Sequence, residues 1–252
     1  MVQRRTHLSR NRAVKAKNRM NARYQENTID FHNPSPRSMP RAVELVPRSC
    51  NQENLVLALL DEAASIVVTV GPAGTGKTYL AMLAAVRSLR AGYCKRLVLT
   101  RPAVGVEDEK HGFLPGDLNA KMEPWTRPLL DVLREYYRPQ DIMRMIEDQI
   151  IEIAPLAFMR GRTFRDSWVI ADEMQNATPA QVKMLMTRIG QNSRIIITGD
   201  TEQADRSKST NGLLDLQNRL NRQPLDGIRL CTLNQRDVQR HRLIGPILNL
   251  YS

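Results

Sequence analysis

The octapeptide GPAGTGKT, residues 71–78, constrains the fold of this 252-residue chain more than any other stretch. It follows the β-branched run SIVVTV (65–70), which is typical of a strand buried on both faces, and it precedes the apolar helical pattern YLAMLAAVRSL (79–89). A glycine-rich turn between a strand and a helix forms a phosphate-binding loop (P-loop), because inward-turned backbone amides and the positive end of the helix attract phosphate. The sequence therefore predicts that this loop binds ATP.

The side chains of the loop predict how the nucleotide is held. The glycines permit the turn, Lys77 is expected to reach the terminal phosphates, and Thr78 is expected to offer its hydroxyl to Mg²⁺. The residues predicted to bind the nucleotide are Gly71, Pro72, Ala73, Gly74, Thr75, Gly76, Lys77 and Thr78. A merely structural glycine-rich turn is the alternative, and the strand and helix on either side disfavour it.

Two adjacent acids, Asp172 and Glu173, follow the apolar run WVIA (168–171). The carboxyl ends of parallel strands meet at one edge of a sheet, so this pair is expected beside the P-loop. Asp172 is predicted to hold Mg²⁺, and Glu173 to orient or deprotonate the attacking water, because phosphoryl transfer requires mainly positioning and charge stabilisation. Without the P-loop, the pair would indicate only exposed acids that open a loop.

A third run, RIIIT (194–198), leads into GDTEQAD (199–205) at the same edge. Gln203 is expected to reach toward the γ-phosphate or the attacking water and to sense hydrolysis. Asp200 is expected to hold the loop through hydrogen bonds to its own backbone. A Gly-Asp pair alone indicates only a turn, so this prediction depends on the two preceding motifs.

Other apolar runs alternate with helical patterns. The runs lie at 96–100, 150–154 and 227–233, and helices are also expected around 55–60 and 129–136. This alternation predicts an α/β fold of the RecA-like P-loop NTPase kind, a three-layer sandwich with a mainly parallel central sheet. One helix is marked in detail, with Thr178 as N-cap, Gln181 as capping-box partner and Gly190 as the stop. The segment 101–149 has few strand signals and is expected to be an insertion or an elaborated crossover.

The net charge of +11 is concentrated near the N-terminus. Residues 1–23 contain eight arginines and lysines and no acid, whereas the other 29 basic residues face 26 acidic ones. We predict that residues 1–48 form a basic, disordered arm and a proline-rich linker attracted to polyanions, and that residues 49–252 form one P-loop ATPase domain. A solubilising tail is the alternative; a mitochondrial transit peptide is disfavoured because the arm has little serine and no amphipathic apolar stripe.

Several other classes are disfavoured. No apolar stretch approaches the ~20 residues that cross a bilayer, and the charged start lacks the apolar centre of a secretory signal, so we expect a cytoplasmic protein with no membrane partner. Cys50, Cys94 and Cys231 show no paired spacing, and the four histidines are scattered. Neither a disulfide framework nor a zinc site is therefore predicted.

From about residue 50 to its C-terminus the chain resembles the PhoH-like family of P-loop ATPases, which occurs in bacteria and phages. The matching segments, in the family's order, are GPAGTGKTYLA, LTRPAVGVEDEKHGFLPGDLNAKMEPWTRPL, IEIAPLAFMRGRTF, VIADEMQN, IITGDTEQAD and DVQRHRLIGPIL. The family is similar to the first nucleotide-binding lobe of superfamily-1 helicases, in which the acid pair belongs to a DExQ motif. The resemblance thus implies helicase-like use of ATP.

This resemblance also implies roles for single residues. Gln52 matches a glutamine that reads the adenine edge, and Arg240 matches an arginine that acts on the γ-phosphate. Gln175 is implied to link the Mg²⁺ site to motifs that sense nucleic acid or a neighbouring subunit. Asn176 is either a second coupling residue or a residue that shapes the turn before Thr178.

The chain departs from the family in two places. Met174 stands where the family often has alanine, which is a conservative change. Asp205, Arg206 and Ser207 follow the third motif where Asp-Leu-Pro is common, and this limits the assignment there to Gln203. The 48 residues before the predicted domain are too few for the PIN ribonuclease domain of some members, so nuclease activity is not expected.

Two classes of function remain open. The first is a nucleic-acid-stimulated ATPase that acts on RNA or single-stranded DNA as a helicase or translocase, with Arg101, Lys121 and Trp125 lining the strand path. A solvated face for the two cations and a core or turn position for the tryptophan are the alternatives. The second class is an ATP-regulated binding module that recruits a nuclease or a ribosome-associated partner and hydrolyses ATP slowly as a timer. A small-molecule kinase is disfavoured, because Glu173 and Gln203 suit water as the acceptor.

The role implied for Arg240 leads us to predict an assembly of several subunits. Helicases of this superfamily use two lobes, and the second supplies an arginine across the cleft, whereas this chain has one lobe. Arg240 is therefore expected to act in trans within a homo-oligomeric ring, expected to be a hexamer. The alternative is that Arg240 caps a helix or forms an ion pair within its own subunit.

Overall fold

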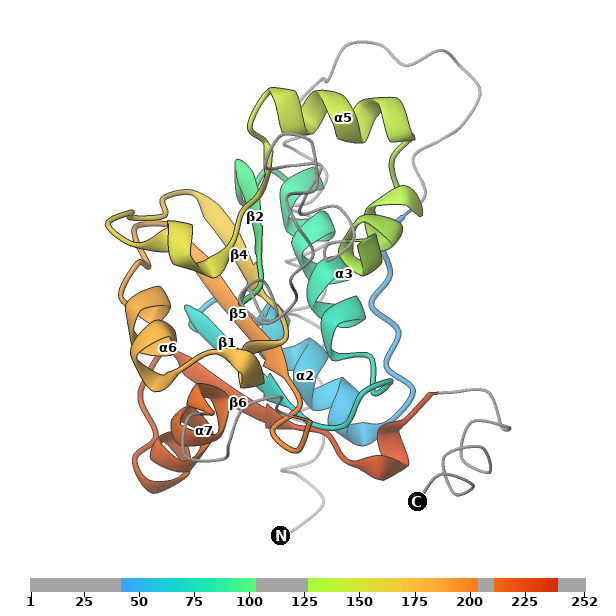
Figure 1. Cartoon of the computed structure of the whole chain (residues 1–252). Coiled ribbons are helices and arrows are strands. Elements are labelled where there is room, and N and C mark those ends of the chain that lie inside the picture. Colours follow the sequence, from blue (N-terminus) through green and yellow to red (C-terminus); the bar gives the residue numbers. More distant parts are fainter. Residues whose placement is uncertain (1–41, 103–126, 204–210, 240–252) are drawn as a thin grey trace, which may run out of the picture.

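Six strands form a parallel sheet at the centre of the computed structural model, which describes residues 42–102, 127–203 and 211–239 (Figure 1). Their spatial order is β3-β2-β4-β5-β1-β6, and every pairing is parallel. The strands are β1 (Ile66–Val70), β2 (Arg96–Thr100), β3 (Ile151–Ile153), β4 (Ser167–Ala171), β5 (Arg194–Gly199) and β6 (Ile228–Thr232). The α/β class and the parallel sheet expected from the sequence are confirmed.

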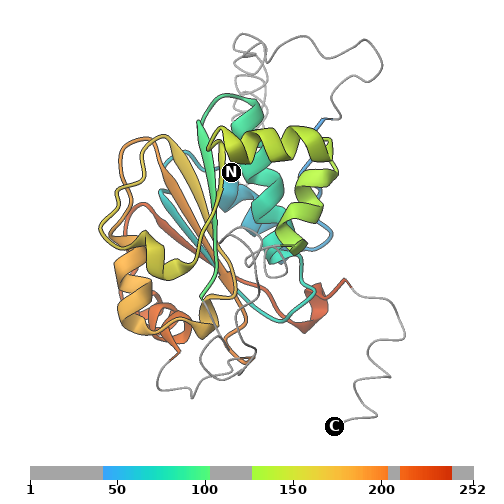
Figure 2. The ribbon, with the colours of Figure 1, turned by 45° about the horizontal axis from the view of Figure 1, so that its top comes forward.

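Helices cover both faces of this sheet (Figures 1 and 2). One face carries α2 (Cys50–Leu60), α3 (Lys77–Arg90) and the helical residues 127–134, and the other carries α6 (Pro179–Met186) and α7 (Gly212–Arg222). A further helix, α5 (Pro139–Glu147), contacts β3. All residues of β1 and β4 are buried, which explains why these strands are continuous apolar runs. The molecule has the three-layer architecture of a RecA-like P-loop protein.

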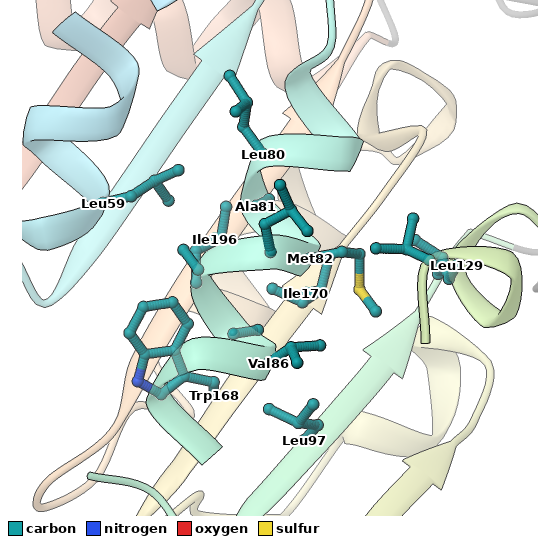
Figure 3. Packing of buried hydrophobic residues seen from close by; sticks show 14 of the residues in the cluster. Leu59, Leu80, Ala81, Met82, Val86, Leu97, Leu129, Trp168, Ile170 and Ile196 are labelled. Atoms are coloured by element: carbon teal, nitrogen blue, oxygen red, sulfur yellow. The ribbon is translucent and has the colours of Figure 1, made fainter. Parts of the chain in front are cut away.

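Helix α3 supplies the centre of the core on its face of the sheet. Figure 3 shows Leu80, Met82 and Val86 of this helix packed over the strand residues Leu97 and Ile170. Each of these side chains is at most 3% exposed, and burying one such side chain stabilises the fold by about 1.5–3 kcal/mol. The helix that starts at the P-loop is therefore fixed firmly against the sheet.

The strand order places three motifs side by side. β5 lies between β1, which leads into the P-loop, and β4, which leads into the acid pair. The loop after β5, which begins with Asp200, therefore emerges between the two other motifs at the carboxyl edge of the sheet. This juxtaposition is a product of the strand order and could not be taken from the spacing of the motifs along the chain.

The expected helices can be compared with the structure. Helices near 55–60 and 129–136 are present, and Thr178 and Gln181 form the predicted capping box at the start of α6. The prediction that Gly190 stops this helix is wrong, because α6 ends at Met186. Gly190 is needed for another reason: a Cβ there would lie 2.2 Å from the carbonyl oxygen of Phe164.

Most of the predicted basic arm and linker, residues 1–41, lies outside the described residues. Near the end of the linker, Val43 and Leu45 pack against the same core cluster as α3. The boundary at residue 48 stays a prediction. Among the described helices, none has the length and apolar character needed to cross a bilayer.

Candidate active site

The loop between β1 and α3 folds as a phosphate cradle. Gly74 and Gly76 have φ of +83° and +82°, in the left-handed region that favours glycine. At Gly71 φ is +151°, and a Cβ would lie 2.5 Å from the carbonyl oxygen of Leu233. Helix α3 begins at Lys77 without a side-chain cap, so its first backbone amides are available to an anion.

Lys77 lies along the inside of this loop. Its ammonium group donates to the carbonyl oxygens of Gly71 at 2.6 Å and Pro72 at 2.8 Å, and the residue is 7% exposed. The hydroxyl of Thr75 donates to the same Pro72 oxygen at 2.8 Å. The loop is therefore preorganised, and its single cation lies where the terminal phosphates of a nucleotide are expected.

Thr78 and Asp172 come together from the start of α3 and the end of β4. Thr78 Oγ1 donates to Asp172 Oδ1 at 2.7 Å, and the hydroxyl of Thr198 on β5 donates to the same oxygen. Asp172 is 1% exposed. Mg²⁺ prefers hard oxygen ligands and usually takes one or two from the protein and others from phosphate, so this pair fits the predicted metal.

A cavity of about 240 Å³ lies between the P-loop, the acid pair and the loop after β5. Its lining includes Lys77, Thr78, Asp172, Glu173 and Gln203. Because a water molecule takes about 30 Å³ of liquid volume, the space has room for a phosphate group together with an attacking water. The structure thus brings together residues from three motifs that are far apart in the sequence.

Glu173 has an unusual backbone. Its φ of +56° is in the left-handed region, which costs a non-glycine residue about 1–2 kcal/mol. The short 3₁₀ helix η2 (Met174–Asn176) follows directly, and the Asn176 amide donates to the Glu173 carbonyl at 3.1 Å. Strain of this kind concentrates at functional sites. Here it turns an exposed carboxylate toward the rim of the cavity.

Gln175 connects two of the motifs. It is 2% exposed; its Nε2 donates to Glu173 Oε2 at 2.5 Å, and its Oε1 accepts from the backbone amide of Asp200 at 3.1 Å. The residue that holds the acid at the rim therefore also holds the loop after β5. Asn176 is 8% exposed and closes the turn before Thr178. The coupling roles predicted for Gln175 and Asn176 stay predictions.

Asp200 extends this connection to the P-loop. Its Oδ1 accepts from the Glu202 amide at 3.1 Å, as expected of a residue that holds its own loop. Its Oδ2 accepts from the amide of Ala73 at 3.2 Å, which the sequence did not predict. Gln203 follows in the same turn and is exposed on the cavity. A continuous set of hydrogen bonds thus joins Glu173, Gln175, Asp200 and the P-loop.

Gln52 lies against the other side of the P-loop. Its Nε2 donates to the Thr75 carbonyl at 2.9 Å, its Oε1 accepts from the Arg48 amide at 2.7 Å, and it is 4% exposed. It also lines a second cavity of about 750 Å³, together with Tyr79 and Tyr136. The structure gives Gln52 a role in holding the P-loop, and its reading of adenine stays a prediction.

Arg101 forms an ion pair with Asp172. Its guanidinium donates to Asp172 Oδ2 from Nε, at 3.0 Å, and from Nη2. The contact with nucleic acid that we predicted for Arg101 stays a prediction. Its side chain is 17% exposed. The position at the end of β2, beside β4, directs it to the acid of the neighbouring strand. Lys121, Trp125 and Arg240 lie outside the described residues, so their roles stay predictions.

The segment after β6, residues 233–239, contacts the P-loop and the start of α2. Asp237 accepts from Asn51 Nδ2 at 2.9 Å and from the Asn234 amide at 2.7 Å. Burial opposes ionisation of this carboxyl, but hydrogen bonds from Ser49, the Asn234 amide and Asn51 hold its pKa below the ordinary value. Two residues later, the Gln239 amide donates to the Gly74 carbonyl at 2.9 Å. The residue before Arg240 is therefore bonded to the P-loop.

Sequence reasoning missed Thr198 as a partner of Asp172. The residue precedes the Gly-Asp motif that ends β5, so a polar side chain at the carboxyl edge was visible in the sequence. Only the order of the strands shows that it lies beside the acid of β4.

Comparisons with known proteins identify relatives of this chain. A family model described as PhoH-like protein matches residues 44–252. A PhoH-like protein of Bacillus subtilis (strain 168) is 49% identical over 186 residues, covering 74% of this chain and 58% of the relative. Protein PhoH of Escherichia coli (strain K12) is 37% identical over 194 residues, covering 76% and 54%. The chain spans somewhat more than half the length of these curated relatives. The crystal structure of the DUF1998 helicase MrfA bound to DNA aligns with a TM-score of 0.46 at 14% identity, covering 80% of this chain and 29% of that one.

Proposed function

This chain belongs to the PhoH-like family, and from this premise we propose that it is a helicase-like P-loop NTPase that hydrolyses ATP with stimulation by RNA or single-stranded DNA. The observation that carries the proposal is the convergence of three motifs on one cavity. Thr78 Oγ1 lies 2.7 Å from Asp172 Oδ1, and Glu173 and Gln203 line the same space. Binding alone would require the P-loop, whereas an acid pair and a glutamine beside it suit hydrolysis.

The side chains divide the chemistry among them. Lys77 and the first amides of α3 bind the phosphates, and Thr78 and Asp172 would hold Mg²⁺. When bound, that ion would neutralise charge on the phosphate oxygens. Glu173 orients the attacking water and accepts its proton, and Gln203 fixes the water against the phosphate. No hydroxyl-bearing substrate is needed, because water is the acceptor.

Nucleic acid is the partner that the charge distribution favours. The eight cations of residues 1–23 would contact phosphates without reading sequence, and such contacts weaken steeply as salt rises. We therefore propose that the basic arm supplies nonspecific affinity for nucleic acid. The P-loop domain alone should then retain ATP binding with reduced nucleic-acid affinity.

The test compares ATP hydrolysis with and without single-stranded RNA or DNA at two salt concentrations. Stimulation at low salt that falls as salt rises is expected. Lack of stimulation at low salt would favour the second candidate, an ATP-regulated binding module that recruits a nuclease or ribosome-associated partner. Such a partner should remain bound to the Glu173→Gln protein in the presence of ATP.

We further propose that Arg240 acts on the γ-phosphate in trans within a homo-oligomeric ring. The Gln239 amide donates to the Gly74 carbonyl of its own subunit, so the residue before Arg240 contacts the P-loop. Arg240→Ala should abolish turnover and spare ATP binding. Mixing Arg240→Ala with Glu173→Gln protein should restore activity at hybrid interfaces, and failure to restore it would indicate action within one subunit.

A further inference from the structure

A row of polar side chains crosses the carboxyl edge of the sheet on the α3 face. Arg101, Asp172 and Thr198 occupy successive places in this row, at the ends of β2, β4 and β5, because the registers of these strands align them. The row contains one cation and one anion. It runs under the P-loop, whose Thr78 also contacts the anion.

The four hydrogen bonds to Asp172 divide evenly between its two oxygens. Oδ1 accepts from the hydroxyls of Thr78 and Thr198, and Oδ2 accepts from two nitrogens of Arg101. The side chain of Asp172 is 2% exposed and that of Arg101 is 17% exposed, so water screens this ion pair little. The carboxylate therefore already has a counter-cation within contact.

The backbone holds both partners in place. The Asp172 amide donates to the Thr100 carbonyl at 3.0 Å, and the Leu156 amide donates to the Arg101 carbonyl at 3.0 Å. Leu156 is 1% exposed and belongs to the 3₁₀ helix η1 (Leu156–Met159). The backbone of Arg101 is therefore fixed, its guanidinium is bonded to Asp172, and a second cation must compete with it for that carboxylate.

We propose that Arg101 is a positioning residue of the metal site that competes with Mg²⁺ for Asp172, so that the metal binds together with the nucleotide and not ahead of it. A neutralised carboxylate attracts a divalent cation weakly, whereas the phosphates of a nucleotide add negative charge at the same place. The competition between Arg101 and Mg²⁺ would regulate ATP hydrolysis, and this regulatory role rests on the proposed function. The competition itself can be measured without hydrolysis.

The experiment measures Mn²⁺ binding by electron paramagnetic resonance in the absence of nucleotide. Arg101→Gln, which removes the charge and keeps a donor, should bind Mn²⁺ at least about tenfold more tightly than the unaltered chain, a difference of about 1.4 kcal/mol. Arg101→Lys keeps the charge and should stay within about threefold of the unaltered chain. Adding Asp172→Asn to Arg101→Gln should abolish the gain.

A matched control is available on the neighbouring strand. Arg162 also donates from two nitrogens to one carboxylate, that of Glu152 on β3, and neither residue lines the cavity of the site. Arg162→Gln should leave Mn²⁺ affinity unchanged. If Arg101→Gln does not fold, judged by circular dichroism and thermal unfolding, Arg101→Met provides the same test.

Unchanged or weaker Mn²⁺ binding by a folded neutral variant would overturn the proposal, because Arg101 would then orient the acid without competing. This failure is distinct from failure of the proposed function. A chain that binds Mn²⁺ as described but does not turn over ATP would refute the ATPase and leave the competition in place.

Discussion

The two halves of the site are built differently, although they start from adjacent residues. In the metal half, Asp172 is 1% exposed and accepts hydrogen bonds from Thr78, Thr198 and Arg101. In the water half, Glu173 is exposed, has a left-handed backbone and contacts Gln175. One acid is fixed by neighbours from two strands and a helix, and among the described residues the other receives a side-chain hydrogen bond from Gln175.

This difference shows how a fold separates binding from chemistry. A metal ligand must keep one position, so its lone pairs are occupied by donors on rigid elements. An acid that handles water must meet a substrate that arrives later, so it lies at the rim and can change its contacts. We therefore expect changes in the metal half to affect stability and hydrolysis together, and changes in the water half to affect hydrolysis alone.

The largest expected effect comes from Asp172→Ala. It leaves the Arg101 charge and two hydroxyls without their acceptor, which should lower the free energy of unfolding by about 3 kcal/mol. Glu173→Ala should change it by less than about 1 kcal/mol, because the side chain is exposed. Urea unfolding followed by circular dichroism measures both values. Equal losses would show that the two halves do not differ in the way described.

The next effect is on the chemical step alone. Glu173→Gln should reduce the rate of hydrolysis by about 10²–10⁴-fold, because it removes a general base and keeps the shape of the side chain. ATP affinity, measured with a fluorescent analogue, should change little. Glu147→Gln, on the exposed face of α5, is the matched control. A Glu173→Gln protein that hydrolyses ATP at the rate of the unaltered chain would show that another residue acts as the base.

Much of this site could be predicted, because its motifs act through local geometry. Glycines with positive φ, a lysine at the start of a helix and acids after a buried strand have the same meaning wherever such a loop occurs. The contacts of Arg101 and Thr198 could not be predicted, because they depend on which strands are neighbours. Periodicity indicates that strands exist and are parallel, but their order is decided by packing across the whole sheet.

Gly190 shows the same limit at one residue. A glycine after an apolar helical stripe usually ends a helix, and the sequence contains no sign of the Phe164 backbone that approaches it. A glycine required by a helix end and a glycine required by a close approach of distant backbone look the same in the sequence. The contact with Phe164 became visible only with the fold.

A smaller effect tests the connection between the two halves. Gln175→Ala removes the acceptor for the buried Asp200 amide and the donor to Glu173. Stability should fall by about 1–2 kcal/mol. Hydrolysis should fall by about tenfold, or about 1.4 kcal/mol, since Glu173 loses the hydrogen bond that Gln175 donates to its carboxylate. Parallel unfolding and turnover assays separate the two, with exposed Gln191→Ala as control. Loss of stability with unchanged turnover would limit Gln175 to a structural role.

The smallest effect comes from Asp237, a buried carboxylate outside both halves. Hydrogen bonds hold its folded pKa below the ordinary value, so it contributes stability above that value and loses the contribution as pH falls through the lowered one. At about pH 7, Asp237→Asn should be less stable by about 1–2 kcal/mol, because hydrogen bonds to a charged acceptor become bonds to a neutral one. Below about pH 3.8 the difference should shrink, since the acid becomes protonated in the unaltered chain as well.

Urea unfolding at a series of pH values measures this difference directly. A difference that stays constant down to about pH 2.5 would show that folding does not lower the Asp237 pKa. ATP turnover at neutral pH supplies the comparison with the site, because Asp237 lies two residues before Gln239, whose amide donates to the Gly74 carbonyl of the P-loop. If Asp237→Asn reduced turnover as strongly as Glu173→Gln, burial and hydrogen bonding would not distinguish acids that support the fold from an acid that acts on water.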